Sequence, residues 1–281
     1  MSVLAPDYSN MFATDGTVLR HPDRPEPRYR PLRAVRNFQA LIKDKEDTSL
    51  VFKIFESLPS GSFMSRARDL CLSEQGEMLR ASEPFLPEIL DDHAALRRTP
   101  KGSLAHAYCD FMEAEGLTAA GLVAEAESLG RAKFPDLLQW FMERSRDTHD
   151  LFHVLTGYGR DALGEQCVLL FTHGQSPSQG HLLIGYAGAA NIKKMVKDSA
   201  APVIGAVREA HRTGKGAPSL MAQSIRELLP QPLEDVRAQL RIPAPVLYQE
   251  CHRIWRAEGI NPYDLLGNPA SEPAAPELLA A

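Results

Sequence analysis

The sequence contains few cysteines, and they lie far apart. Cys71, Cys109, Cys167 and Cys251 form no CxxC pair. This spacing fits neither a zinc ribbon nor the dense disulfide pattern of a small secreted domain. The simplest interpretation is four reduced thiols in a cytosol-like compartment, so the fold must be stabilised by its core rather than by cross-links.

The chain also lacks an excess of basic charge and a long apolar run. Its 31 Lys and Arg residues stand against 36 Asp and Glu residues, for a formal charge of −5, so no nucleic-acid partner is expected. No stretch reaches the roughly 18 apolar residues of a membrane-spanning helix. The segment Met1 to Arg33 has neither a signal-peptide nor a transit-peptide pattern. We therefore expect a protein that touches a membrane at most.

Alternating β-branched runs are scarce as well, whereas apolar residues recur at three- and four-residue spacing between Gly and Pro breaks. This pattern predicts an all-α protein with a single multi-helix domain. Prolines and scattered charge predict an extended N-terminal arm at residues 1–27. The helical domain is predicted at 28–258, and the Pro- and Ala-rich end at 259–281 is predicted to be a loose C-terminal tail.

The strongest helix prediction begins at Pro135, where proline suits a first turn, Asp136 suits the positive end of the helix dipole, and Gly157 marks the end. The next helix is predicted to begin near Asp161, a suitable N-cap. The predicted helices span about 33–58 with a break near 44–48, 61–81, 85–98, 102–115, 135–156, 161–172, 181–197, 200–213, 217–229, 231–240 and 244–258.

The segment HDLFH, residues 149–153, carries the clearest chemical pattern. His149 and His153 are four residues apart, so on a helix both imidazoles lie on one face and can share a metal ion. A turn near residues 158–159 folds the next helix back and places Glu165 opposite His153. Gly164 has no side chain and lets the two helices approach closely. The sequence thus predicts a metal-binding helical hairpin.

Two imidazoles and one carboxylate form the three-ligand set of an open catalytic metal site. Asp150, about 100° round the helix from His149, is either a fourth ligand or a partner that orients an imidazole. The donors suit Fe(II) or Zn(II), and Mn(II) as well. Arg146, one turn before His149, is a candidate contact for an anionic substrate group, with an exposed charged face as the alternative.

Several other interpretations compete with this one. A lone HxxxH pair is often a coincidence. The pattern is similar to the HExxH metallopeptidase motif, but Asp150 stands where the glutamate general base would be. The HD dipeptide is also found in metal-dependent phosphohydrolases, whose further ligands have no clear counterpart here. His173 and His181 flank a loop and are expected to be solvated.

The stretch RSRDTHDLFHVLTGYGRDALGE, residues 144–165, resembles the coenzyme Q biosynthesis protein 4 family, whose signature is HDxxH, eleven residues, then Glu. PKGSLAHAYCDFM at residues 100–112 and the segment at 210–245 are similar to other parts of the family, so the resemblance covers roughly residues 76–245. One departure is Leu228-Leu229-Pro230-Gln231, where family members carry a Trp-Glu step.

The resemblance implies metal ligands at His149, Asp150, His153 and Glu165, with Glu165, Asp150 and Arg146 as candidate catalytic residues. It implies a role in ubiquinone biosynthesis, through oxidative decarboxylation and hydroxylation of a prenylated 4-hydroxybenzoate-derived ring. The alternative is a non-catalytic, prenyl-lipid-binding scaffold for a ubiquinone biosynthetic complex. The implied partners are a polyprenylated aromatic ring intermediate, other ubiquinone biosynthesis enzymes and a membrane surface; a homodimer stays open.

Two further expectations concern location and substrate access. Without a transit pattern, the chain is expected to be a bacterial cytoplasmic protein, peripheral at the inner face of the inner membrane. A polyprenyl tail must leave water while its ring sits at the metal, so an apolar channel is expected from the ion to the surface.

Overall fold

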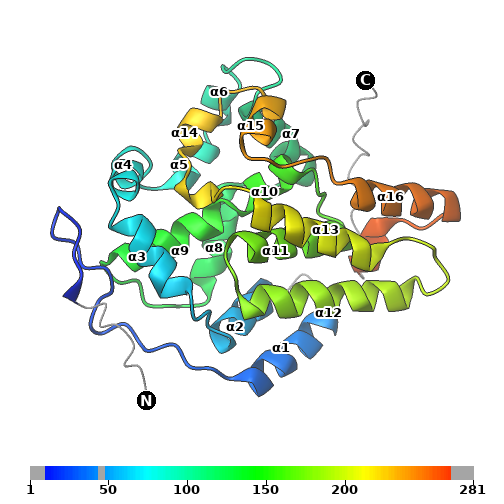
Figure 1. The fold of residues 1–281 in the computed structure, drawn as a ribbon, viewed down its shortest axis with the longest axis horizontal. Coiled ribbons are helices and arrows are strands. Elements are labelled where there is room, and N and C mark those ends of the chain that lie inside the picture. Colours follow the sequence, from blue (N-terminus) through cyan, green and yellow to red (C-terminus); the bar gives the residue numbers. More distant parts are fainter. Residues whose placement is uncertain (1–9, 44–47, 267–281) are drawn as a thin grey trace.

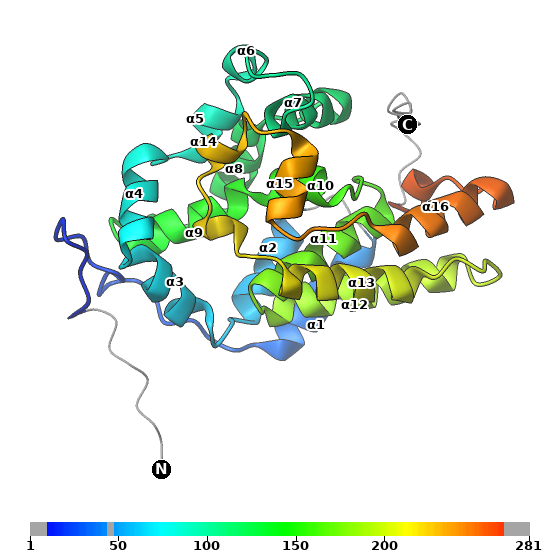
Figure 2. The same ribbon diagram turned by 45° about the horizontal axis from the view of Figure 1, so that its top comes forward.

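The computed structural model describes residues 10–43 and 48–266. These residues fold into helices joined by loops, with two isolated β bridges and no strand, which confirms the predicted all-α class (Figures 1 and 2). The elements are α1 (Pro31–Lys43), α2 (Thr48–Ser57), α3 (Phe63–Cys71), α4 (Glu74–Ser82), α5 (Leu86–Leu90), α6 (His93–Leu96), α7 (Leu104–Glu115), α8 (Ala119–Ser128), α9 (Leu137–Asp147), α10 (His149–Thr156), α11 (Ala162–Gln175), α12 (Gln179–Met195), α13 (Val203–Gly216), η2 (Leu220–Ala222), α14 (Ile225–Leu228), α15 (Leu233–Gln239), α16 (Val246–Glu258) and η3 (Pro262–Leu266).

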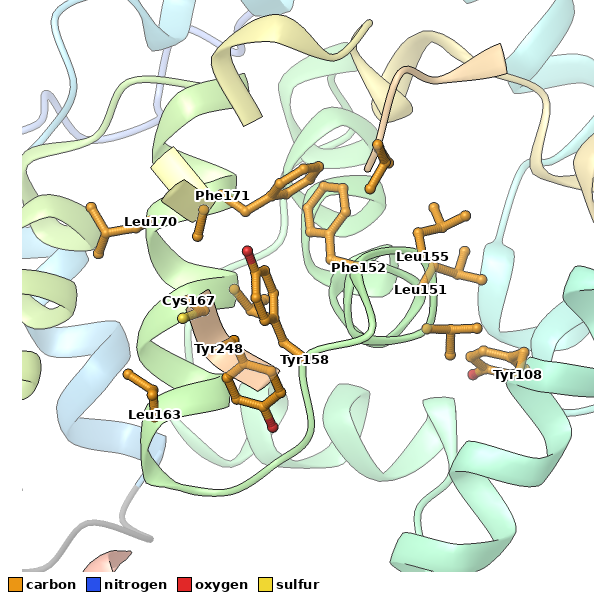
Figure 3. Packing of buried hydrophobic residues seen from close by; sticks show 14 of the residues in the cluster. Tyr108, Leu151, Phe152, Leu155, Tyr158, Leu163, Cys167, Leu170, Phe171 and Tyr248 are labelled. Atoms are coloured by element: carbon orange, nitrogen blue, oxygen red, sulfur yellow. The ribbon is translucent and has the colours of Figure 1, made fainter. Parts of the chain in front are cut away.

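Helices α10 and α11 lie in the middle of the molecule (Figure 1). Helix α11 packs against α12 and α13, and α10 packs against α7. Their buried side chains form the largest apolar cluster, in which Phe152 of α10 meets Phe171 of α11 with ring centroids 5.2 Å apart (Figure 3). The two helices that carry the predicted metal ligands are therefore supported by the main core on several sides.

Glycine allows α13 to approach α11 closely. A Cβ atom at Gly214 would lie 2.1 Å from the backbone carbonyl oxygen of Phe171, a distance that any larger residue would have to relieve by moving the helices apart. Close backbone contact of this kind is a common structural use of glycine. It keeps α11 fixed along its length.

The helix predicted over residues 135–156 is two helices, α9 and α10, with a break at Thr148. The Thr148 hydroxyl donates to the carbonyl oxygen of Arg144 at 3.0 Å, and such back-bonding bends helices. Asp136 is the N-cap of α9, because its side chain accepts from the Gln139 amide at 2.8 Å. Pro135 therefore precedes the helix instead of opening its first turn.

Three other predicted helices have the wrong bounds. Within or near each of them, a short polar side chain caps the start of a new helix. Ser73 caps α4, Asp92 caps α6 and Ser224 caps α14, each by accepting from a backbone amide three residues later. Capping residues of this kind favour a helix start over continuation. The affected predictions are 61–81, 85–98 and 217–229.

Helix α8 is absent from the sequence predictions. Its sequence AAGLVAEAES offers a weak apolar stripe, and Ala119 is its one buried residue. The predicted break near residues 44–48 lies mostly outside the described residues, since 44–47 are not described.

The chain outside the predicted helices also makes contacts. Leu19 is fully buried against α9 and α3, and η3 forms within the segment expected to be a tail. The division into an arm, a domain and a tail stays a prediction, and parts of it, residues 1–9 and 267–281, lie outside the described residues. Across the described ranges, every helix is too short or too polar to cross a bilayer.

A buried ion pair joins α9 to the loop after α4. Nη1 of Arg144 lies 2.8 Å from Oε2 of Glu83, and both side chains are almost fully buried. The other Arg144 nitrogens donate to the carbonyl oxygens of Met221 and Gln223. Because the charged groups satisfy one another, loss of either partner would leave an uncompensated buried charge.

We expect Glu83→Gln to lower the free energy of unfolding by about 3 kcal/mol or more, since it leaves the Arg144 charge buried without a counter-ion. Urea denaturation followed by circular dichroism measures this. Glu250→Gln, which breaks the exposed pair between Glu250 and Arg253, is the matched control and should leave stability unchanged. Equal effects of the two substitutions would contradict the assignment.

Candidate metal centre

The hairpin between α10 and α11 is fixed by its local sequence. Gly157 ends α10 with a positive φ of 73°, a conformation that glycine adopts without strain. Asp161 then caps α11, because its carboxylate accepts from the amides of Leu163 and Gly164 at 3.0 and 3.2 Å. The predicted end of one helix and the predicted cap of the next are both confirmed, and Glu165 consequently falls in the first turn of α11.

The hairpin brings together His149, His153 and Glu165. Nε2 of His149 lies 3.9 Å from Oε2 of Glu165, and Nε2 of His153 lies 3.7 Å from Oε1. One ligand atom from each residue lies within 4.8 Å of the others. Two atoms bound to one ion at about 2.1 Å each are at most about 4.2 Å apart. The spacing around Glu165 therefore fits a shared divalent ion.

The hydrogen bond at the other ring nitrogen of His153 determines its tautomer. Nδ1 lies 3.0 Å from the carbonyl oxygen of Tyr158, and a carbonyl can only accept, so Nδ1 carries the proton. In the neutral imidazole, Nε2 then presents a lone pair toward the Glu165 carboxylate. This nitrogen is buried and, within the described part of the chain, has no hydrogen-bond partner. Two electron-pair donors facing each other across a buried gap suit a cation between them.

Electrostatics in the site favour an ionised carboxylate. Burial acts to raise the pKa of Glu165, but the neighbouring His153 and His149 outweigh it and lower that pKa to about 2. Burial acts to lower the pKa of His153, yet attraction to Glu165 raises it above its ordinary value. The pKa of His149 is lowered by burial and by His153. Glu165 is thus charged at neutral pH, and protons and metal ions compete for the site.

Asp150 and Arg146 are placed less centrally. Asp150 is buried in the first turn of α10, and it is not among the residues whose ligand atoms converge. Nε of Arg146 donates to Oδ1 of Asp147 at 2.6 Å. Among the described residues, Arg146 has no ion pair with Glu165.

The side chain of Arg160, which the sequence pattern did not indicate, lies at the site. Nε of Arg160 is 3.6 Å from Oε1 of Glu165, and Nη1 is 3.9 Å from Oε2 of Glu115. The Arg160 side chain is 39% exposed, so it can also reach a solute. The signal in the sequence was its position directly before the cap Asp161, in the turn between the two ligand-bearing helices.

The two histidines expected to be solvated are instead packed. Nδ1 of His173 lies 2.8 Å from the carbonyl oxygen and 3.1 Å from the amide nitrogen of Ser178. The ring of His181 lies tilted against the ring of Phe55 with centroids 4.4 Å apart, and burial lowers its pKa to about 3. The expectation for His181 fails because α12, which carries it, packs against α2, and local sequence does not indicate this contact.

A cavity of about 190 Å³ lies at this same turn, lined by residues 60–62 and 177–179 together with His173. None of the three ligand residues lines it. It is also smaller than the roughly 300–1,000 Å³ of typical small-molecule pockets. The expected apolar channel from the ion is not seen at this cavity.

The C-terminal helix α16 holds the hairpin turn from outside. The Tyr248 hydroxyl donates to Oδ2 of Asp161 and accepts from the Gly159 amide at 2.9 Å. Nε2 of His252 lies 3.3 Å from the same Oδ2. The rings of Tyr158 and Tyr248 also meet, with centroids 5.2 Å apart (Figure 3). The turn that positions both His153 and Glu165 is therefore tied to a helix about 90 residues later.

The family model described as "Coenzyme Q (ubiquinone) biosynthesis protein Coq4" matches residues 32–245, which is most of the chain. The chain belongs to the Coq4 family. This confirms the resemblance found in the sequence and places the protein in a family of ubiquinone biosynthesis proteins. The helix α16, which ties down the hairpin, lies beyond the matched residues.

Individual relatives agree with the family. Ubiquinone biosynthesis protein COQ4 homolog 2, mitochondrial, from Culex quinquefasciatus is 31% identical over 103 residues, which cover 36% of this chain and 43% of that protein. Ubiquinone biosynthesis protein COQ4, mitochondrial, from Arthroderma otae is 24% identical over 208 residues, covering 70% of this chain and 71% of that protein. The match thus spans less than half the length of the Culex Coq4 protein.

A crystal structure from Nostoc punctiforme, assigned to ubiquinone biosynthesis, has the same fold. It superposes with a TM-score of 0.52 at 19% identity and covers 77% of this chain and 100% of that chain. At this level of identity the likeness concerns the Coq4 fold alone.

The expected bacterial, inner-membrane location is wrong. The curated Coq4 relatives, from Culex, Arthroderma, Podospora, Penicillium and Aspergillus, are named mitochondrial proteins of eukaryotes. The expectation rested on the charge pattern of the first residues, and that pattern carries no information about where the folded domain works.

We expect His153→Ala to lower the affinity for a divalent ion by at least about tenfold, because it removes a ligand rather than a supporting contact. Bound metal should also fall as the pH drops through the range in which the imidazoles take up protons. The raised pKa of His153 means that this competition begins at a higher pH than for an ordinary histidine. Elemental analysis after dialysis against metal-buffered solutions measures both effects.

The control for this experiment is His211→Ala, which removes a histidine on α13 that is not among the converging ligands. It should leave bound metal unchanged. Equal metal content in the His153→Ala and unmodified proteins would remove the hairpin as a metal site.

Tyr248→Phe deletes the hydroxyl that bridges Gly159 and Asp161, so it should loosen the hairpin turn. We expect metal affinity to fall by several-fold, while circular dichroism shows an intact helical fold. Tyr186→Phe removes a hydroxyl for which no hydrogen bond is found among the described residues, and it should have no effect. If the two substitutions change metal affinity equally, α16 does not position the ligands.

Proposed function

We propose that this Coq4 protein is a metal-dependent enzyme of ubiquinone biosynthesis that catalyses oxidative decarboxylation and hydroxylation of a prenylated 4-hydroxybenzoate-derived ring. The observation that carries the proposal is the convergence of the ionised Glu165 and the buried Nε2 of His153, which has no hydrogen-bond partner among the described residues. Both Fe(II) and Zn(II) suit these donors, and Mn(II) fits as well. Of the three, Fe(II) supplies the chemistry for dioxygen when it is bound.

The side chains around the ligands have separate roles in this proposal. His149, His153 and Glu165 hold the ion and leave coordination positions open, since such an ion accepts about six ligands. Arg160 orients the substrate by pairing with its ring carboxylate, a contact that guanidinium groups make in a bidentate manner. Asp150 supports the site electrostatically by raising the pKa of His153 together with Glu165.

The proposed reaction breaks the bond between the ring and its carboxylate carbon, which leaves as carbon dioxide. A carbon–oxygen bond forms at the same ring carbon, with dioxygen as the oxidant. One oxygen atom enters the product as a hydroxyl group, which takes up one proton. The other leaves as water with two further protons, and an external reductant supplies the two electrons. Arg160 holds the carboxylate until it departs.

The second candidate is a non-catalytic scaffold that binds prenyl lipids and other ubiquinone biosynthesis enzymes. One observation favours it: α1 presents an apolar stripe to solvent. Leu32, Val35 and Ile42 on that stripe are 83, 46 and 37% exposed. Arg33 and Arg36 lie beside it, a combination that suits an anionic lipid surface.

The test supplies the prenylated, carboxylated ring with Fe(II), a reductant and labelled dioxygen. Labelled hydroxyl in the product, none without oxygen, and a loss of turnover by at least about a hundredfold in Glu165→Gln are expected, because the amide keeps the shape but loses the ligand's charge. Arg160→Gln should raise KM far more than the comparison variant Arg146→Gln. Product without oxygen, or full activity of Glu165→Gln, would contradict the oxidative mechanism.

The same preparation distinguishes a lipid-binding scaffold from an enzyme. No turnover under any condition, together with binding to anionic vesicles that is lost in Leu32→Glu, is the result expected of a lipid-binding scaffold. A protein that turns substrate over in detergent and binds no vesicles would exclude the scaffold as its main role.

A further inference from the structure

A second cluster of metal-binding side chains lies on α6 and α7, away from the hairpin. Cys109 and Glu113 are four residues apart on α7 and so share one face of that helix. His93 opens α6, which packs against α7. One ring nitrogen of His93, the Cys109 sulfur and one Glu113 carboxylate oxygen lie within 4.8 Å of one another. A nitrogen, a sulfur and an oxygen donor thus meet at one point.

The Glu113 carboxylate is held in position for such a role. Arg97 donates to its Oε2 at 2.7 Å, while Oε1 lies 3.0 Å from Nδ1 of His93. Arg97 also binds Asp110, one turn earlier on α7, at 2.5 Å. The contact of Arg97 with Oε2 orients the carboxylate and so directs Oε1 toward the cluster. Residues that hold metal ligands in place act in the same way.

An ion-pair network alone leaves the sulfur of the cluster unused. It accounts for Arg97, Asp110, Glu113 and Nδ1 of His93, but the Cys109 side chain is fully buried and takes no part in it. Nε2 of His93 is likewise buried and has no hydrogen-bond partner in the described ranges. Buried polar atoms without partners are uncommon and call for an explanation.

We propose that His93, Cys109 and Glu113 form a second divalent-metal site that takes Zn(II) and pins α6 to α7. Formal charges support this. With a thiolate at Cys109, the three anions Cys109, Asp110 and Glu113 are balanced by Arg97 and one dication. Mixed nitrogen, sulfur and oxygen donors suit Zn(II), and the half-exposed Glu113 leaves a side open for water as the fourth ligand.

This site is independent of the hairpin centre and of the function proposed for it. Phe111 of α7 stacks on His153 with ring centroids 5.4 Å apart. Cys109 and Glu113 are each two residues from Phe111, about 200° round the helix, so they occupy the opposite side of α7. The two ions would therefore bind on either side of one helix.

Binding at the second site must release a proton from the Cys109 thiol. Burial raises the pKa of this thiol above its ordinary value, so the metal competes with a tightly held proton. Affinity should therefore rise with pH over the range near neutrality and above.

Titration of the full chain with Co(II) tests the proposal, because Co(II) replaces Zn(II) and gives a near-ultraviolet charge-transfer band when a thiolate is bound. The hairpin centre has no thiolate. We expect two Co(II) ions per chain, one of them with this band. Cys109→Ser should abolish the band and one equivalent of Co(II), whereas His153→Ala should lose the other equivalent and keep the band.

Two controls keep the test decisive. Cys251→Ser removes another buried thiol and should keep the band. If Cys109→Ser fails to fold, Glu113→Gln changes only a half-exposed group and should lower Co(II) affinity at the thiolate site by at least about tenfold. Absence of a charge-transfer band in the unmodified protein, or a band that survives in a folded Cys109→Ser protein, would overturn the second site.

Discussion

The hydrogen bond from His153 Nδ1 to the Tyr158 carbonyl is the contact on which the site depends. It fixes the tautomer of one ligand, and it does so through the backbone of the turn that also delivers Glu165. Gly157 and Asp161 set the ends of the two helices around that turn. The chemical state of His153 and the position of Glu165 therefore follow from a five-residue connection.

The parts of the site that could be predicted from the sequence are those set by local periodicity and capping. The four-residue spacing of His149 and His153, the stop at Gly157 and the cap at Asp161 need no distant contact. Gly164 is needed, but not for the close approach of the two helices that the sequence predicts. A Cβ atom there would lie 1.9 Å from the carbonyl oxygen of Gly159, so glycine is needed by the turn rather than by the approach of α10.

The parts that could not be predicted depend on residues far apart in the chain. Arg160 becomes a site residue only when Glu165 and Glu115 converge on it. Tyr248 and His252 reach Asp161 from α16, beyond the part of the chain that matches the Coq4 family. Long-range packing of this kind also decides which polar side chains are buried, which is why His181 was expected in solvent.

Family membership and geometry constrain different aspects of function. The Coq4 match places the chain in a family of ubiquinone biosynthesis proteins. The convergence of His149, His153 and Glu165 indicates which chemistry the site can support. Helix α7 packs against α10, and α16 holds the hairpin turn through Tyr248, so the rest of the fold supports both ligand-bearing helices. A site organised in advance by its protein surroundings can bind an ion with little rearrangement.

The metal centre can be tested with crystals of the protein purified without chelators and measured at the absorption edge of the metal they contain. We expect an anomalous peak within about 2.3 Å of His149 Nε2, His153 Nε2 and a Glu165 oxygen. Soaking in Fe(II) or Zn(II) should produce the same peak if the metal was lost in purification. A hairpin without a peak after such soaking, or a peak contacted by only one of the three residues, would contradict the metal centre.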